Sequence, residues 1–316
     1  MFLLELSVGA KVSFLAVTVG EFVLGMLGNG LIALVNCMEW VKNGKISSAD
    51  FILFNLAVAR IIQLWLTLLG IFIWLSPQRF DNGKLILVLT ILWTLSNHLS
   101  TWFTTCLSIF YFLKIANFSH TLFLWLKWRM KRVVLVLFFG SFFILSVDLT
   151  MKGALSELWL KTYIGHASND TLNLFPRTIY YLDYVILSLI FIIPFLLSLI
   201  SLLLLYLSLL RHTKNWQLNT LNSRDSCIEA HKRAMKMVAA FLILFLLYCT
   251  SILLANWIFF VREKFQANMV ATILSIVFLS SHSFAIIFGN KKLKKISLRL
   301  LCYLRFSRIK VKYFNS

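Results

Sequence analysis

The chain has 316 residues, of which 60% are hydrophobic and 14% are charged, and its formal net charge is +19. So much apolar surface excludes a soluble domain with one core, and it indicates a protein surrounded by lipid. The five cysteines have no CxxC spacing, so the sequence predicts neither a disulfide framework nor a zinc site. The basic residues therefore have to be placed relative to the apolar segments before any partner is inferred for them.

Seven segments are long and apolar enough to cross a membrane as helices. A helix needs about 20 mostly apolar residues to span the hydrocarbon core, because no backbone polar group can be left unpaired in lipid. The sequence thus predicts an all-α membrane protein, a bundle of seven transmembrane helices. The predicted spans are residues 12–37, 51–75, 85–112, 133–151, 179–207, 237–261 and 268–289.

The distribution of Lys and Arg predicts the orientation of these spans. The polar segments fall into two alternating sets, which carry 22 and 8 basic residues, and the richer set includes the tail. The positive-inside rule then puts the tail in the cytoplasm and the amino terminus outside. We expect residues 1–289 to form the transmembrane domain and residues 290–316 to form a basic cytoplasmic tail. Basic and apolar residues alternate in this tail, which predicts a short amphipathic helix along the membrane surface.

This topology determines which of two glycosylation sequons and one cysteine can be modified. Asn169 lies in the longest outer loop and is expected to be glycosylated, whereas Asn117 lies in an inner loop and is not. Cys302 lies in the basic tail, where two interpretations stay open: a palmitoylated cysteine, or an unmodified one on an apolar helix face.

Arg60 is the most conspicuous polar residue within a predicted span. A charged side chain at mid-bilayer costs roughly 3 kcal/mol on insertion scales, so it must face the bundle and find partners. Asn29 and Ser283 lie at comparable depth in the first and seventh spans, with His282 beside Ser283. We expect these residues to form an inner polar network, which is either a switch or a purely structural tie between helices.

A second polar group follows one face of the third span. Trp93, Asn97 and Ser100 recur at i, i+4 and i+7, so they share a helix face. An indole offers a large stacking area and an amide orients a ligand, the combination expected in a small-molecule pocket. The alternative is interhelical packing, in which Asn97 bonds only a neighbouring helix. The outer halves of other spans add four candidate ligand-binding residues: Asp183, Tyr248, Thr272 and Ser275.

No enzymatic motif accompanies these residues. The six histidines lack metal-ligand spacing, and neither a GxSxG nor a phosphate-binding loop is present. We therefore expect no catalytic activity, no cofactor and no metal. The spans also lack the internal repeats and paired broken helices that are typical of transporters.

Five motifs along the chain resemble those of the type 2 bitter taste receptors, a family of G-protein-coupled receptors. The resemblance covers nearly the whole chain. The motifs are LKIANFS at 113–119, FLWLKWR at 123–129, IPFLLSLISLLLLYLSL at 193–209, AHKRAMK at 230–236 and HSFAIIFGNKKLK at 282–294.

The resemblance implies a plasma-membrane receptor that binds bitter small molecules in an outer cavity and activates a gustducin-type heterotrimeric G protein. It implies ligand contacts at Trp93 and Asn97, an aromatic switch at Tyr248, and the family's inner network at Asn29, Arg60 and Ser283. Basic residues on the inner side, with Lys114, Lys214 and Lys236 as the candidates, are expected to face the G protein. A pheromone-type chemosensory receptor and a transporter or channel remain as alternative functions.

Overall fold

The computed structural model describes residues 8–75, 83–165, 191–211, 225–258, 264–299 and 302, and this part of the chain is helical without a strand. In chain order the helices are α1 (Val8–Asn43), α2 (Ser48–Leu75), α3 (Gly83–Ile115), α4 (Thr121–Trp128), α5 (Met130–Gly165), an unlabelled helix (Phe191–Arg211), α7 (Asp225–Ile258) and α8 (Lys264–Gly289). A further helical segment covers residues 291–299.

The seven-helix prediction is confirmed. Six of the described helices are long and apolar enough to cross a membrane, and α7 adds a shorter apolar stretch, Met235–Ser251. Several helices extend beyond the predicted spans: α5 continues to Gly165 rather than ending at 151, and α7 begins at Asp225 rather than at 237. The extension of α5 contains Ala, Leu, Glu and Lys, which are strong helix formers outside as well as inside lipid.

The helix α4 was not predicted, because its eight residues are too few to produce a clear periodic signal. His120 precedes it in an extended conformation, and the side chain of His120 accepts a hydrogen bond from the Leu122 N–H. This cap satisfies one of the backbone donors that the first turn of a helix leaves unpaired.

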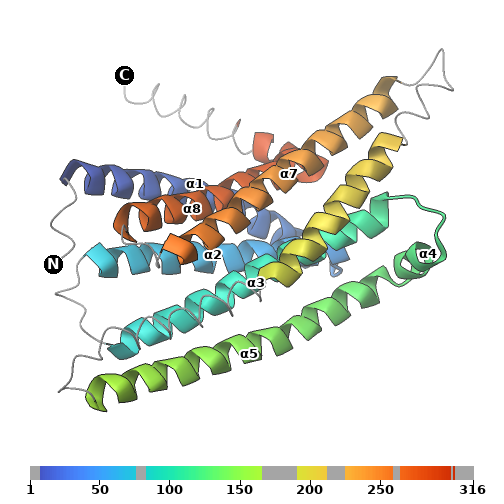
Figure 1. Cartoon of the computed structure of the whole chain (residues 1–316). Coiled ribbons are helices and arrows are strands. Elements are labelled where there is room, and N and C mark those ends of the chain that lie inside the picture. The colour runs from blue at the N-terminus through green and yellow to red at the C-terminus, as the bar shows by residue number, and fades with distance from the viewer. Residues whose placement is uncertain are drawn as a thin grey trace, which may run out of the picture.

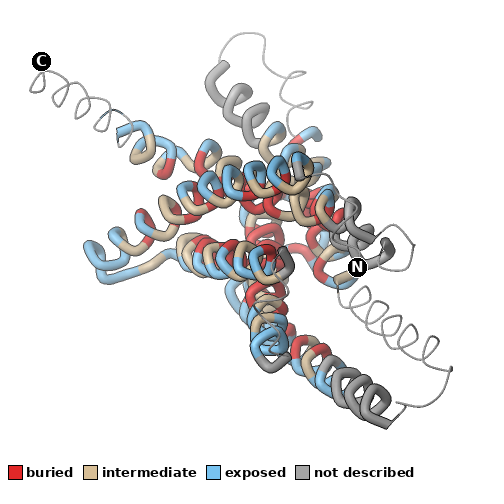
Figure 2. Tube along the Cα trace, turned by 90° about the vertical axis from the view of Figure 1, so that its left-hand side faces the viewer, coloured by how far each residue is buried: buried red, intermediate tan, exposed pale blue. Residues whose placement is uncertain are grey.

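The helices form one bundle (Figure 1). α1 packs between α2 and α8, α8 also packs against α7, and α3 packs against both α2 and α5. Buried positions follow the inward sides of the helices, while the outward sides are exposed (Figure 2). These outward sides are rich in Leu, Ile, Val, Phe and Trp. An apolar exterior, with the polar side chains of the helices turned inward, is the arrangement that a lipid environment favours.

Several helix ends that carry lysines lie together, and we call this side the basic end of the bundle. Here α1 stops at Asn43 and turns through Gly44, whose φ of 62° is left-handed and suits glycine. The first turn of α2 follows at once. The Ser47 hydroxyl accepts a hydrogen bond from the Asp50 N–H at 3.2 Å and donates one to the Asp50 carboxylate at 2.7 Å.

The segment after α8 docks against the same end. Asn290 caps it, since the side-chain oxygen of Asn290 accepts from the Lys292 N–H at 3.0 Å. Leu293 is fully buried, whereas Lys291, Lys294 and Lys295 are exposed, so this segment is amphipathic. Lys292 forms an ion pair with Glu39 of α1 and lies 3.8 Å from the Asp50 carboxylate of α2.

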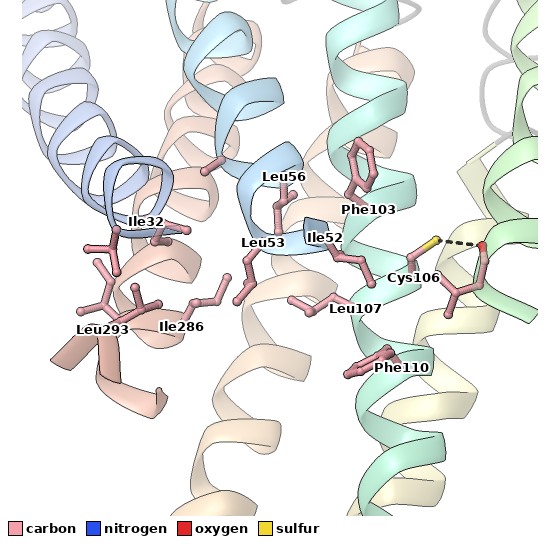
Figure 3. Packing of buried hydrophobic residues seen from close by; sticks show 14 residues of the cluster. Ile32, Ile52, Leu53, Leu56, Phe103, Cys106, Leu107, Phe110, Ile286 and Leu293 are labelled. Atoms are coloured by element: carbon pink, nitrogen blue, oxygen red, sulfur yellow. Dashed lines mark hydrogen bonds between the residues drawn. The ribbon is translucent and has the colours of Figure 1, made fainter. Parts of the chain in front are cut away.

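One hydrophobic cluster fills the interior toward the basic end (Figure 3). It combines Ile32 and Val35 of α1, Leu53 of α2, Phe110 of α3 and Leu293 of the last segment. Figure 3 also shows the Cys106 thiol, which donates to the Val134 carbonyl of α5 at 3.9 Å. The segment after α8 therefore belongs to the packed bundle.

A small residue sets the distance between α1 and α8. A Cβ atom built at Gly28 would lie 3.2 Å from the Ser283 Cβ, so the two helices are in close contact at this level. Small residues at such crossings allow helix backbones to approach within a membrane. The close approach also brings the neighbouring Asn29 within hydrogen-bonding distance of Ser283.

We predict that Gly28→Val separates α1 from α8 and destabilises the receptor. Overpacking of this kind typically costs about 1–3 kcal/mol, so the melting temperature in detergent and the surface expression should both fall. Gly30→Val is the matched control, because a Cβ there meets nothing within 4 Å. Equal melting temperatures for the two variants would contradict the close contact.

Candidate functional site

The Arg60 guanidinium lies wholly buried at the centre of the bundle and joins three helices. Its Nη1 lies 2.6 Å from Nδ1 of His282 and 3.4 Å from the Ser283 hydroxyl, both on α8. Its Nη2 donates to the Thr104 hydroxyl of α3 at 3.2 Å. We call Arg60, Thr104, His282, Ser283 and Asn29 the arginine cluster. The structure thus brings together the four residues that the sequence placed in an inner network.

Asn29 reaches Arg60 only through Ser283. The Ser283 hydroxyl donates to the Asn29 side-chain oxygen at 2.7 Å, and the Asn29 amide nitrogen donates to the Gly25 carbonyl of its own helix at 2.8 Å. Asn29 therefore joins the network indirectly, because the Ser283 hydroxyl bonds both Asn29 and Arg60.

The partners of Arg60 determine the protonation of His282. An arginine side chain has only donors, so Nδ1 of His282 must accept, which requires a neutral imidazole with its proton on Nε2. The ring packs against Phe241 and Phe278, at centroid distances of 4.3 and 5.5 Å. The positive charge of the cluster therefore remains on Arg60 alone.

Among the described residues, no carboxylate forms an ion pair with Arg60. Its charge is stabilised instead by hydroxyl and imidazole dipoles and by the ring of Phe278, whose centroid lies 5.4 Å from the guanidinium carbon. Cation–π contacts contribute up to about 2 kcal/mol when they are desolvated. A buried charge held only by neutral groups depends strongly on the positions of those groups.

A second cluster lies farther from the basic end. Asn97 of α3 accepts two hydrogen bonds at its side-chain oxygen, from Gln63 of α2 at 3.0 Å and from the Tyr248 hydroxyl of α7 at 2.5 Å. All three side chains are almost fully buried. We call Gln63, Asn97 and Tyr248 the amide cluster. One amide oxygen thereby connects three helices.

Trp93 lies one helical turn beyond Asn97 on α3 and is only half-buried. Its indole N–H donates to the Thr67 hydroxyl of α2 at 3.2 Å. Because this N–H is already paired, Trp93 can offer further contacts only through its aromatic surface.

Phe278 of α8 lies between the two clusters. Its ring stacks on Tyr248 at a centroid distance of 4.4 Å and also lies under the Arg60 guanidinium. Phe278 is therefore a single side chain in contact with both Tyr248 and Arg60.

The other predicted ligand-binding residues have different surroundings. The Ser275 hydroxyl lies 3.3 Å from that of Ser251 on α7, and it also donates to the Ala271 carbonyl at 2.9 Å. Thr272, one helical turn above Ile276, is half-buried. Asp183 lies outside the described residues, as do Asn169 and Lys214.

The basic residues predicted to face a G protein differ in exposure where they are described. Lys114 and Lys236 are exposed at the basic end. By contrast, Lys127 of α4, which is not one of these candidates, contacts the protein itself: its ammonium donates to the Ala116 carbonyl at 2.8 Å and lies 5.5 Å from the Phe123 ring centroid.

Sequence reasoning missed Gln63, Thr104 and Glu21. Gln63 and Thr104 each carry one polar group at a helical position facing a neighbouring helix, a signal too common in membrane helices to single them out. Glu21 had a clearer signal, since it is an acidic residue inside the first span. Its carboxylate accepts from the Ser280 hydroxyl at 2.5 Å, a second polar contact between α1 and α8.

Among the described residues, no group of three His, Cys, Asp or Glu side chains is arranged to hold a metal ion. The buried polar side chains of the described residues are mostly hydroxyls and amides, together with the imidazoles of His98 and His282, the carboxylate of Asp148 and the guanidinium of Arg60. Groups of this kind can orient a small molecule by hydrogen bonds and can join neighbouring helices.

A family model described as "Taste receptor protein (TAS2R)" matches residues 7–305. The chain is 44% identical to "Taste receptor type 2 member 42" of Pan troglodytes over 299 residues, and 44% identical to the Homo sapiens protein of that name over 296 residues. Each alignment covers 92% of this chain and 94% of the relative. The chain belongs to the type 2 taste receptor family.

A second subgroup of the family is also similar, since "Taste receptor type 2 member 7" of Macaca mulatta is 40% identical over 301 residues, 92% of this chain and 93% of the relative. The protein is thus a multi-pass membrane protein and a bitter taste G-protein-coupled receptor rather than an enzyme. These relatives favour the taste receptor function over the pheromone-type, transporter and channel alternatives.

We predict that His282→Phe destabilises this taste receptor while preserving the ring packing on Phe241 and Phe278. The variant removes the acceptor for Arg60, and hydrogen bonds to charged groups contribute about 1.5–3 kcal/mol. The melting temperature in detergent should therefore fall, and His282→Asn, which restores an acceptor, should recover part of the loss. His98→Phe is the matched control, because His98 is a buried histidine without a contact to Arg60. Equal effects at both positions would argue against the Arg60–His282 bond.

Proposed function

We propose that the receptor binds bitter small molecules in a cavity bordered by Trp93, Asn97 and Tyr248, on the side of the bundle opposite its basic end. The observation that supports this most strongly is the half-buried Trp93, which stands one turn beyond the fully buried amide cluster. A stacking surface above one oriented amide is a common arrangement in small-molecule sites. Thr272, Ser275 and Asp183 are proposed as further contacts.

The proposed site favours breadth of recognition over affinity. Burying ~400 Å² of apolar ligand surface at ~25 cal/mol/Å² yields ~10 kcal/mol, and the costs of ordering and desolvation offset most of it. Micromolar or weaker affinity follows. With the indole N–H and the Asn97 oxygen already paired, few oriented polar groups are left to reject a wrong ligand.

In this proposal, agonists act by binding the active arrangement of the helices more tightly than the resting one. The amide cluster is in contact with Phe278, and Phe278 is in contact with Arg60. The arginine cluster is therefore proposed as a switch rather than a purely structural tie. At the basic end, the exposed Lys114 and Lys236, together with Lys214, are proposed to face a gustducin-type G protein.

We predict that Trp93→Ala abolishes calcium responses to bitter compounds in cells that express a gustducin-chimeric G protein, while the receptor still reaches the surface. The stacking surface is lost but the two clusters below it remain. Trp93→Phe should retain a response with a higher half-maximal concentration. Trp65→Ala serves as the control, since that indole lies on the exposed side of α2. A normal dose response in Trp93→Ala would remove the indole from the proposed site.

The topology belongs to the same proposal, with the basic end and the tail in the cytoplasm and the receptor in the plasma membrane. We predict that an epitope tag after residue 316 stains only in permeabilised cells. Asn169→Gln should remove a glycosidase-sensitive shift in apparent mass, whereas Asn117→Gln should leave it unchanged. Staining of the tag on intact cells would invert the proposed orientation.

A further inference from the structure

The helix α4 carries large apolar side chains on two opposite sides. On one side, Phe123 is buried in a cluster with Leu113 of α3 and Leu209 of the helix Phe191–Arg211. On the other side, at positions that helical spacing turns away from Phe123, three large apolar side chains are exposed. They are Leu124, Trp125 and Trp128, with exposed fractions of 49%, 50% and 91%. We call these three residues the exposed face of α4. Neighbouring apolar side chains that remain exposed mark a site of contact with a membrane or a protein.

The contacts of α4 place it at the level where a membrane span ends, beside the last turn of α3 (Figure 1). The Phe123 ring meets the Phe112 ring of α3 at a centroid distance of 5.3 Å. The Lys127 ammonium donates to the Ala116 carbonyl at 2.8 Å. Phe112 lies in the last turn of the apolar span Leu85–Ile115, and Ala116 follows that span directly. The headgroup region begins where the hydrocarbon core of ~30 Å ends, so α4 lies at the depth of the membrane interface.

A surface that faces lipid begins close to α4 along the chain. Only Arg129 separates the end of α4 at Trp128 from the first residue of α5. Within the apolar span that α5 forms, Val136 and Phe143 are exposed to 70% and 73%, as expected of side chains that contact acyl chains. Val136 follows Trp128 by about two helical turns. The bilayer that covers α5 therefore lies within reach of the exposed face of α4.

The charges around α4 fit an anionic lipid surface. Residues 112–147 contain five basic side chains and no Asp or Glu. Three of the basic side chains follow the exposed face directly and are exposed themselves: Arg129, Lys131 and Arg132. The guanidinium carbon of Arg129 lies 5.0 Å from the Trp125 ring centroid, so its charge lies over the indole. Tryptophans beside cations are typical of the membrane interface, and juxtamembrane basic residues attract anionic headgroups.

The other possible occupant of the exposed face is the G protein. A G protein is bound only during signalling, so at all other times these three apolar side chains would face water, which is unfavourable. A bilayer is always present at the depth where α4 lies. Constant cover and the neighbouring cations therefore both favour lipid.

We propose that α4 is an interfacial anchor that binds anionic phospholipids. Its exposed face inserts at the boundary between headgroups and acyl chains. Arg129, Lys131 and Arg132 bind the phosphate groups, for which the guanidinium forks are well suited. Phe123 and Lys127 hold the opposite side of α4 against the bundle, so the lipid contact fixes the segment that joins α3 to α5. This inference goes beyond the proposed agonist site and does not depend on it.

The first test identifies what covers the exposed face. Trp128 is replaced by the photoreactive residue benzoylphenylalanine in the full-length receptor, which is reconstituted in nanodiscs of equal parts phosphatidylcholine and phosphatidylserine with a purified heterotrimeric G protein present. After irradiation, mass spectrometry should find phospholipid adducts at this position. Leu124 carries the same label in a second variant, so the test remains decisive if the first variant does not fold.

Two further positions calibrate the first test. Phe143, which is exposed in the middle of the α5 span, should form lipid adducts with a similar yield. Asn117, which is exposed in the loop before α4, should form severalfold fewer. Adducts to the G protein alone at Trp128 and Leu124, or no lipid adduct there while Phe143 forms one, would overturn the proposal.

The second test measures the preference for anionic headgroups from the same adducts. Phosphatidylserine adducts at Trp128 should exceed phosphatidylcholine adducts severalfold, and Arg129→Gln should reduce this ratio while the total yield changes little. Lys236→Gln is the matched control, because Lys236 is an exposed lysine on α7, which packs against α8. Equal yields of the two lipids, or equal effects of the two variants, would overturn the binding of anionic headgroups. Both faces of a nanodisc carry the same lipids, so the result depends neither on orientation in the cell nor on an agonist. A failure of the proposed function would therefore leave both tests valid.

Discussion

A single buried positive charge is the constraint on which the interior of this receptor depends. Arg60 is fully buried, and among the described residues its hydrogen-bond partners are all neutral. The free energy of such a charge rises steeply if a partner moves away, because the low dielectric of the interior strengthens every lost interaction. The helices that supply these partners, α3 and α8, are therefore held in one arrangement relative to α2. A different arrangement needs another set of partners for the guanidinium.

Close packing between helices brings the partners of Arg60 within hydrogen-bonding distance. Gly28 lets α1 approach α8 closely enough for Asn29 to bond Ser283, which in turn bonds Arg60. At a different level, Thr105 of α3 bonds the Ser198 hydroxyl and the Pro194 carbonyl of the helix Phe191–Arg211. Pro194 and Ser198 lie one turn apart on that helix, so the two contacts connect α3 to the same face of it. Hydroxyl and amide contacts thus join helices that apolar packing alone would leave free to slide.

In the proposed function, the same interior divides into a part that binds ligands and a part that responds to binding. Trp93 and the amide cluster combine an aromatic surface with polar atoms that are already paired, which suits weak recognition of varied apolar molecules. The arginine cluster has no exposed polar atom to offer a ligand, but its energy is sensitive to geometry. Phe278 contacts both clusters, so a guest that displaces Tyr248 alters the surroundings of the charge without touching it.

Much of the fold could be predicted from the sequence, because the lipid environment restricts which residues a membrane-spanning helix can contain. A span must be apolar and about 20 residues long, so the seven helices and the inward direction of Arg60 follow from composition and spacing alone. The same rule made Arg60, Ser283 and His282 candidates for one network. It could not predict that Ser283 stands between Asn29 and Arg60, since hydrogen-bond partners depend on ångström-scale helix offsets that periodicity does not contain.

Only the tertiary structure decided which of the many single polar groups meet. In the sequence, Gln63 and Thr104 cannot be distinguished from any serine, threonine or glutamine that bonds its own helix, as Thr250 does. Their importance arises from the relative register of α2 and α3, which is the result of packing along the whole length of both helices. The sequence by itself determined that a charge would be buried. The register of the helices decided which atoms surround it, because side chains from different helices meet only after the bundle has closed.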